Sequence, residues 1–166
     1  MTPARLGFAV AVATALVDQA TKVWAVTELA GREPIRILPV LDLVLAWNRG
    51  ISYSLFPADG LAGRLVLIGI AIVALIVLAV WIARTPSRFT SVALGLVAGG
   101  AAGNVIDRAR TGAVIDFLYF HTPVPLGPLS NYVFNPADAA IVLGAAGLLY
   151  ESFTSGRRAP ETTPAP

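Results

Sequence analysis

The chain has 166 residues, of which 56% are hydrophobic and 13% are charged, and its formal net charge at pH 7 is only +2. Its mean hydropathy of +0.73 is too high for an ordinary soluble domain. The small net charge gives no indication of nucleic-acid binding. The absence of cysteine excludes disulfides, iron–sulfur clusters and thiol nucleophiles, and the single histidine cannot form a multi-histidine metal site.

Four apolar stretches predict membrane-spanning helices. A helix that crosses a bilayer needs about 20 mostly apolar residues, and residues 65–83 meet this need without one charge. The predicted helices span residues 6–28, 64–84, 89–109 and 136–154. The fold class that follows is an all-α integral membrane protein with four transmembrane helices and a small extracytoplasmic β-rich segment. Residues 1–155 are expected to form a single membrane-embedded domain.

The first apolar stretch has a second interpretation. Arg5, followed by an apolar segment and the small residues Ala13-Thr14-Ala15, is also typical of a cleavable signal peptide. Asp18 and Lys22 argue against it, because they lie four residues apart and continue the helical register. Cleavage would also leave an odd number of spans.

The connections between the helices predict the remaining elements. Residues 30–63 alternate between apolar and polar in places and are interrupted by proline and glycine, which indicates a few short strands on the membrane surface. Residues 114–120 form a second apolar run, and a proline-rich loop follows at 121–133. The tail at 156–166 is rich in proline, threonine and alanine and is expected to be disordered.

The basic residues predict the orientation in the membrane. With four spans, the N-terminus, the second connection and the C-terminus share one side. The basic residues on that side are Arg5, Arg84, Arg88, Arg157 and Arg158. The positive-inside rule places them in the cytoplasm. The opposite side also carries arginines, so the bias is modest.

Four aspartates lie at the edges of the apolar stretches: Asp18, Asp107, Asp116 and Asp138. A carboxylate at membrane depth is costly and tends to have a partner or a function. Two carboxylates brought together can share one proton and perform acid and base chemistry on one substrate.

Two of these acids have basic neighbours. Asp18 precedes Lys22 by one helical turn, which indicates either an intrahelical ion pair or a support for a polar active centre. Asp107 and Arg108 end the third helix, where they could form a surface pair. Alternatively, Asn104 and Arg108, one turn apart, could brace a site through hydrogen bonds.

The other two acids lie on either side of the second outer loop. Asp116 follows an apolar dipeptide and precedes aromatic residues, so burial should shift its pKa upward, unless it occupies a solvent-facing strand position. Asn135, Pro136 and Asp138 match the N-cap, N1 and N3 positions of a helix start. An acid at N3 favours the helix dipole even without a function, and the dipole stabilises its ionised form.

These strings together resemble the signal peptidase II family. The matching pieces are Asp18-Gln19-x-x-Lys22, Asn48-x-Gly50, Gly99-Gly100-Ala101-x-Gly103-Asn104-x-x-Asp107-Arg108, Val114-Ile115-Asp116-Phe117 and Phe134-Asn135-x-Ala137-Asp138. Each piece alone is weak, and the Asn48–Gly50 piece alone reads as turn chemistry. The five pieces occur in the family's order and cover nearly the whole chain.

The resemblance implies an aspartic endopeptidase of the bacterial inner membrane. It would remove the signal peptide from prolipoproteins by cutting before a diacylglyceryl-modified cysteine, and globomycin-type cyclic peptides would inhibit it. The resemblance assigns the catalytic pair to Asp116 and Asp138. The supporting or substrate-binding residues would be Asp18, Lys22, Asn48, Gly50, Asn104, Asp107, Arg108 and Asn135. It implies no metal and no cofactor, and its partners would be prolipoproteins and membrane lipids.

The chain departs from the family's usual pattern around the site. Residues 51–53 are Ile-Ser-Tyr where small residues and then an aromatic are usual, the 121–133 loop is more elaborate, and Pro136 replaces a larger apolar residue. These differences concern loop shape and substrate contacts.

The expected chemistry divides acid and base roles between the two aspartates. One ionised aspartate, expected to be Asp138, takes a proton from water, and the other, Asp116, donates one to the carbonyl oxygen and later helps the amine leave. A proton-coupled transporter also needs buried carboxylates and is the alternative function. A non-catalytic membrane scaffold, in which the acids are caps and surface charges, is the third.

Overall fold

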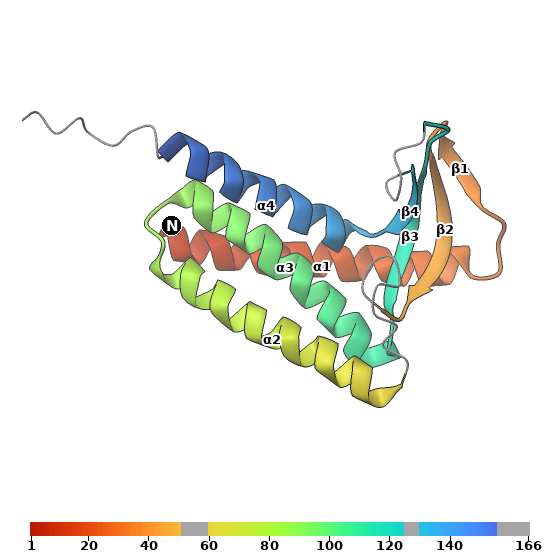
Figure 1. The fold of residues 1–166 in the computed structure, drawn as a ribbon, viewed down its shortest axis with the longest axis horizontal. Helices are drawn as coiled ribbons and strands as arrows, with labels where there is room; N and C mark the ends of the chain where they lie inside the picture. The colour runs from red at the N-terminus through yellow and green to blue at the C-terminus, as the bar shows by residue number, and fades with distance from the viewer. Residues whose placement is uncertain (51–59, 125–129, 156–166) are drawn as a thin grey trace, which may run out of the picture.

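The computed structural model describes residues 1–50, 60–124 and 130–155. Four helices and one four-stranded sheet make up this part of the chain (Figure 1). In chain order the elements are α1 (Pro3–Leu29), β1 (Ile35–Leu38), β2 (Leu41–Asn48), α2 (Leu61–Arg84), α3 (Arg88–Thr111), β3 (Val114–His121), β4 (Asn131–Phe134) and α4 (Pro136–Ser155). The 156–166 tail lies outside the described residues.

The helices confirm the expected class of an integral membrane protein. Among the described residues, α1, α2 and α3 are long and apolar enough to span a membrane. The fourth predicted span, α4, does not belong to this set. It has 20 residues, and the polar residues at its two ends, such as Asp138 and Glu151, dilute its apolar middle. Large apolar side chains are exposed along α2, as expected for a surface that faces lipid.

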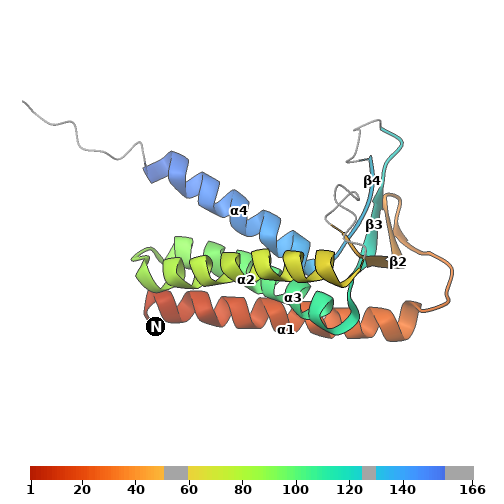
Figure 2. The same ribbon diagram turned by 60° about the horizontal axis from the view of Figure 1, so that its bottom comes forward.

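Helix α3 lies at the centre of the helical layer, because its glycines let two neighbours approach closely. A Cβ atom at Gly95 or Gly99 would overlap backbone atoms of α1, and one at Gly100 would overlap the backbone of Ala137 in α4. In Figure 2, α4 leans away from the plane of α1, α2 and α3 toward its C-terminal end. There, Ser87 Oγ and Thr90 Oγ1 donate hydrogen bonds to the Glu151 carboxylate of α4.

The sheet lies at the end of the helices where α1 ends and α4 begins (Figure 1). Its strands are antiparallel in the order β1-β2-β3-β4. Phe117 of β3 packs against Ala25 and Leu29 of α1, which fixes the sheet on the end of that helix.

The prediction that the 30–63 segment contains a few short strands is confirmed for its described residues. The segment supplies β1 and β2, and α2 begins within it at Leu61. Residues 51–59 lie outside the described part. The other two strands, β3 and β4, come from the connection between α3 and α4. A lone two-stranded hairpin is only marginally stable, and β2 gains its second partner in β3.

Candidate active site

The four predicted acids reach one region from four elements: α1, α3, β3 and α4. Asp18, Asp107 and Asp116 are 1%, 2% and 3% exposed, and Asp138 is partly buried. Such burial of carboxylates requires partners, and each of the four has them.

Lys22 is the cation at the centre of this region and is itself 1% exposed. Its Nζ lies 2.9 Å from Asp18 Oδ2 and 2.7 Å from Asp107 Oδ2. The third donor direction goes to Asn104 Oδ1 at 2.9 Å. Gln19 completes the cluster, since its Nε2 donates to Asp107 Oδ1 at 2.8 Å. Asp18 and Lys22 therefore form the intrahelical pair, and the same ammonium joins α1 to α3.

The interpretation of Asp107 and Arg108 as a surface pair is wrong. Asp107 turns toward α1 and β3, where its Oδ2 also accepts the backbone N–H of Ile115 at 3.2 Å. Successive helical residues point about 100° apart, so Arg108 faces elsewhere. Its Nη2 donates to the Gly50 carbonyl at 3.0 Å. The two residues brace different segments.

The start of α4 holds Asp138 through a reciprocal capping arrangement. The Asp138 backbone N–H donates to Asn135 Oδ1 at 3.0 Å, and the Asn135 backbone N–H donates to Asp138 Oδ2 at 3.3 Å. The next free amide of this helix end, that of Ala137, donates to Asp18 Oδ1 of α1 at 3.1 Å. Asp18 thus caps a helix of which it is not a part.

Asn135 also connects the two aspartates of the predicted pair. Its Nδ2 donates to Asp116 Oδ1 at 2.6 Å, while its backbone N–H and Oδ1 hold Asp138. The second oxygen of Asp116 accepts from Asn48 Nδ2 at 3.2 Å. Asn48 is held in turn by the Gly50 backbone N–H, which donates to its Oδ1 at 3.2 Å. Residues 51–53, where the sequence departs from the family pattern, lie outside the described part.

Asn104 links the charged cluster to the pair. An ammonium can only donate, so the Lys22 contact assigns Oδ1 of Asn104 to the lysine side. The amide Nδ2 therefore points the other way and donates to Asp138 Oδ1 at 3.0 Å. Asn135 Nδ2 also reaches Asn104 Oδ1, at 3.3 Å. The contact with Lys22 therefore orients the Asn104 amide so that its N–H group donates to Asp138.

The surroundings of the two carboxylates differ. Burial raises the pKa of Asp116 from 3.8 to about 6, and the nearby charge of Asp138 acts in the same direction. The amide donors Asn48 and Asn135 oppose this effect. Asp138 sits at a helix N-terminus and accepts two N–H donors. The site is suited to hold a proton on Asp116.

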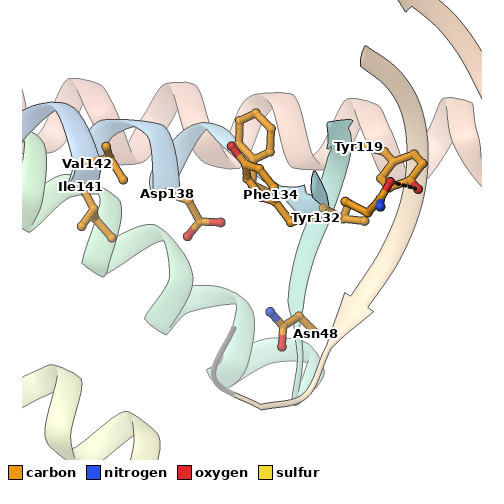
Figure 3. Close-up of a pocket in the computed structure, with 9 residues that line it drawn as sticks. Asn48, Tyr119, Tyr132, Phe134, Asp138, Ile141 and Val142 are labelled. Carbon is orange, nitrogen blue, oxygen red and sulfur yellow. Dashed lines mark hydrogen bonds between the residues drawn. The ribbon is translucent and has the colours of Figure 1, made fainter. Parts of the chain in front are cut away.

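A cavity of about 610 Å³ opens beside this pair. Figure 3 shows Asp138 between Ile141 and Val142 of α4 on one side and Phe134 and Tyr132 on the other. Asn48 lines the cavity from β2. Most of the cavity lining is apolar, and Asp138 is the acidic residue in it. A mainly apolar ligand can therefore bind there with one of its polar bonds next to the carboxylates.

Sequence reasoning did not single out every residue of the site. Gln19 lies inside the Asp18–Lys22 string, and its Nε2 binds Asp107. Its position directly after Asp18 was the sequence signal that could have identified it as a site residue. Tyr119 and Asn131 line the cavity and are joined by a 3.2 Å hydrogen bond. Nothing in their local sequence marks them, because only the pairing of β3 with β4 brings them together.

Comparisons with known proteins give one consistent result. A family model described as signal peptidase II matches residues 10–154. A lipoprotein signal peptidase of Nitrobacter hamburgensis is 48% identical over 164 residues, which cover 96% of this chain and 100% of that protein. One of Methylorubrum extorquens is also 48% identical over 164 residues, covering 98% and 94%.

Two solved structures, both bacterial membrane enzymes determined by the in meso method, resemble the fold. One, at 2.3 Å resolution, has a TM-score of 0.78 and 22% identity, with 96% of this chain and 94% of that chain covered. The other, at 1.9 Å resolution, has a TM-score of 0.73 and 26% identity, with 88% and 91% covered. The first likeness concerns the fold alone.

Proposed function

We propose a mechanism and a substrate for this chain, which belongs to the signal peptidase II family. It is a multi-pass bacterial membrane protein and a signal peptidase. The finer proposal is an aspartic endopeptidase that removes the signal peptide from diacylglyceryl-modified prolipoproteins by cleaving before the lipidated cysteine. Asp116 and Asp138 are its catalytic residues.

One observation carries the proposal. Asn135 binds both carboxylates, Asp116 through its side-chain amide and Asp138 through its backbone N–H. Two carboxylates held by one residue, one of them in a buried setting that raises its pKa, meet the requirement for acid–base hydrolysis.

Asp138 is the base and Asp116 the acid in the proposed reaction. Asp138 takes a proton from water, the resulting hydroxide adds to the scissile carbonyl carbon, and Asp116 gives its proton to the carbonyl oxygen. The tetrahedral product then collapses. Asp138 passes its new proton to the amide nitrogen as the C–N bond breaks, and Asp116 recovers a proton from a hydroxyl group. Both residues end in their starting states.

The remaining polar residues hold this arrangement. Asp107 binds Lys22, Lys22 donates to Asn104, and Asn104 donates to Asp138. On the opposite side of the pair, Arg108 binds the Gly50 carbonyl, and Gly50 orients Asn48 against Asp116. These contacts support positioning roles for the predicted supporting residues.

The protein is proposed to lie in the inner membrane with its active site at the outer face. The N-terminus and the α2–α3 connection, with Arg5, Arg84 and Arg88, lie at the end of the helices away from the sheet (Figure 1). The positive-inside rule favours the cytoplasm for that end. The carboxylate pair, near the sheet, then lies at the outer boundary of the bilayer, where a prolipoprotein's cysteine and its lipid can reach it.

The transporter alternative finds no support in the comparisons, all of which concern signal peptidases or membrane enzymes. The four aspartates Asp18, Asp107, Asp116 and Asp138 also gather in one region near the sheet, whereas α2 contributes no acid.

The test is a cleavage assay of purified protein with matched prolipoprotein precursors, one bearing diacylglyceryl on the cysteine and one without it. The proposal expects cleavage before the cysteine in the lipidated precursor only, and inhibition by globomycin. Cleavage at another bond, or equal cleavage of both precursors, contradicts it.

A further inference from the structure

The cavity beside Asp138 runs along the edge of a strand. Its lining includes Asn131, Tyr132, Val133 and Phe134, four consecutive residues that make up the whole of β4. Side chains of a strand alternate between the two faces of the sheet. A cavity that contacts four successive residues therefore lies against the edge of the strand. In the described sheet β4 is the terminal strand, with β3 on its other side.

The pairing with β3 determines which backbone groups of β4 face this edge. Thr122 N donates to Ser130 O at 2.9 Å, one pair beyond the end of the β3–β4 ladder and in the same register. Hydrogen-bonded and non-hydrogen-bonded pairs alternate in an antiparallel ladder. Tyr132 and Phe134 therefore bond to β3.

It follows that Asn131 and Val133 direct their backbone N–H and C=O groups away from β3, toward the cavity. Exposed edge groups of this kind can pair with another extended chain. The strand also has a defined direction, since it runs from Asn131 toward Asn135 and Asp138.

The two ends of the cavity differ in a way that orients a peptide. Ile141 and Val142 lie one turn beyond Asp138 along α4, and Val142 is 66% exposed, so this end opens toward lipid. At the other end Asn131 is exposed and hydrogen-bonded to Tyr119. An apolar signal helix fits the first end and a polar mature chain the second.

We propose that the free edge of β4 binds the first residues of the mature lipoprotein as an added antiparallel strand. This inference rests on the proposed function. A chain cut at Asp138 that continues outward runs from Phe134 toward Asn131, opposite to β4. Four strand residues extend about 14 Å, which accommodates about four residues of substrate. The affinity comes from main-chain hydrogen bonds and so depends little on the substrate's side chains.

The substrate side of the pairing is tested with synthetic diacylglyceryl peptides. A backbone ester replaces each amide in turn at the second to fifth residues after the cysteine, which removes one N–H donor and little else. For the positions that pair with Val133 or Asn131, kcat/KM should fall about 2- to 10-fold. These positions should alternate with positions that show no loss.

Equal kcat/KM values for the four ester positions, or losses that do not alternate along them, overturn the inference while leaving the proposed function intact. If the all-amide peptide is not cleaved before its cysteine, the proposed function fails, and the inference fails with it.

The enzyme side of the pairing is tested at Val133. Val133→Pro removes the outward N–H without breaking a bond to β3, a change that edge strands tolerate. Val133→Ala is the matched control, because it shortens the side chain and keeps the N–H. Relative to Val133→Ala, Val133→Pro should lower kcat/KM about 2- to 10-fold, because only the proline variant lacks the outward N–H.

The two arms combine in a double cycle. At the substrate residue that pairs with Val133, the losses caused by the ester and by Val133→Pro should not be additive, because the two changes remove the two hydrogen bonds of one residue pair. Equal activities of the two Val133 variants contradict the pairing. If Val133→Pro does not fold, the ester series on the wild-type enzyme decides the matter alone.

Discussion

Replacement of Lys22 by methionine should destabilise the protein severely. The ammonium uses its three donor directions on Asp18, Asp107 and Asn104, at 2.9, 2.7 and 2.9 Å, and is 1% exposed. Methionine fills the space of the side-chain stem but leaves two buried carboxylates without their cation. Loss of one partner of a buried ion pair costs about 3–5 kcal/mol. The free energy of unfolding of wild type and variant in the same detergent, measured by denaturant titration, gives this difference.

A second substitution distinguishes the lost charge from lost packing. Asp107→Asn in the Lys22→Met background removes one of the two stranded charges, so the double variant should be more stable than Lys22→Met alone. The interaction energy from the four proteins should lie at about 1–3 kcal/mol. A cost of less than about 1 kcal/mol for Lys22→Met, or strict additivity of the two changes, would refute the reasoning.

Three further substitutions test the site and the packing. Asn48→Ala removes a donor that favours the Asp116 anion, so the pKa of Asp116 should rise above about 6. The alkaline limb of kcat/KM, where Asp116 loses its proton, should then move upward by about one pH unit; a limb that stays in place or moves down contradicts the assignment. Gly103→Ala places a methyl group on the Asp18 carboxylate and should lower stability by about 1–3 kcal/mol. Gly69→Ala, with no heavy atom within 4 Å of the new group, should raise stability by about 0.5–1 kcal/mol in the same unfolding assay.

The helices could be predicted because their signal is local. Residues 65–83 are long enough and apolar enough to span a bilayer in any context. The start of α4 was equally predictable, because Asn135, Pro136 and Asp138 occupy the N-cap, N1 and N3 positions within four residues of sequence. The Asp18–Lys22 pair followed from helical spacing alone.

The contacts that cross the sequence could not be predicted. Asp107 pairs with Lys22 on another helix, although Arg108 is its neighbour in the chain. Arg108 instead holds Gly50. The sheet shows the same limit, because β3, the second partner of β2, comes from the connection between α3 and α4 and no local pattern specifies this pairing. Such pairings are set by how the helices pack, which periodicity and composition do not encode.

The most direct test of the central claim is cleavage of a diacylglyceryl-modified prolipoprotein by Asp116→Asn, by Asp138→Asn and by the double variant, each first shown to unfold at a temperature close to that of wild type. The account predicts that each single substitution lowers kcat by at least about 10²–10⁴-fold. It also predicts that the double variant is little worse than either single one, because the two residues act as a unit. Retention of substantial activity by either folded single variant would contradict the claim that Asp116 and Asp138 perform the hydrolysis.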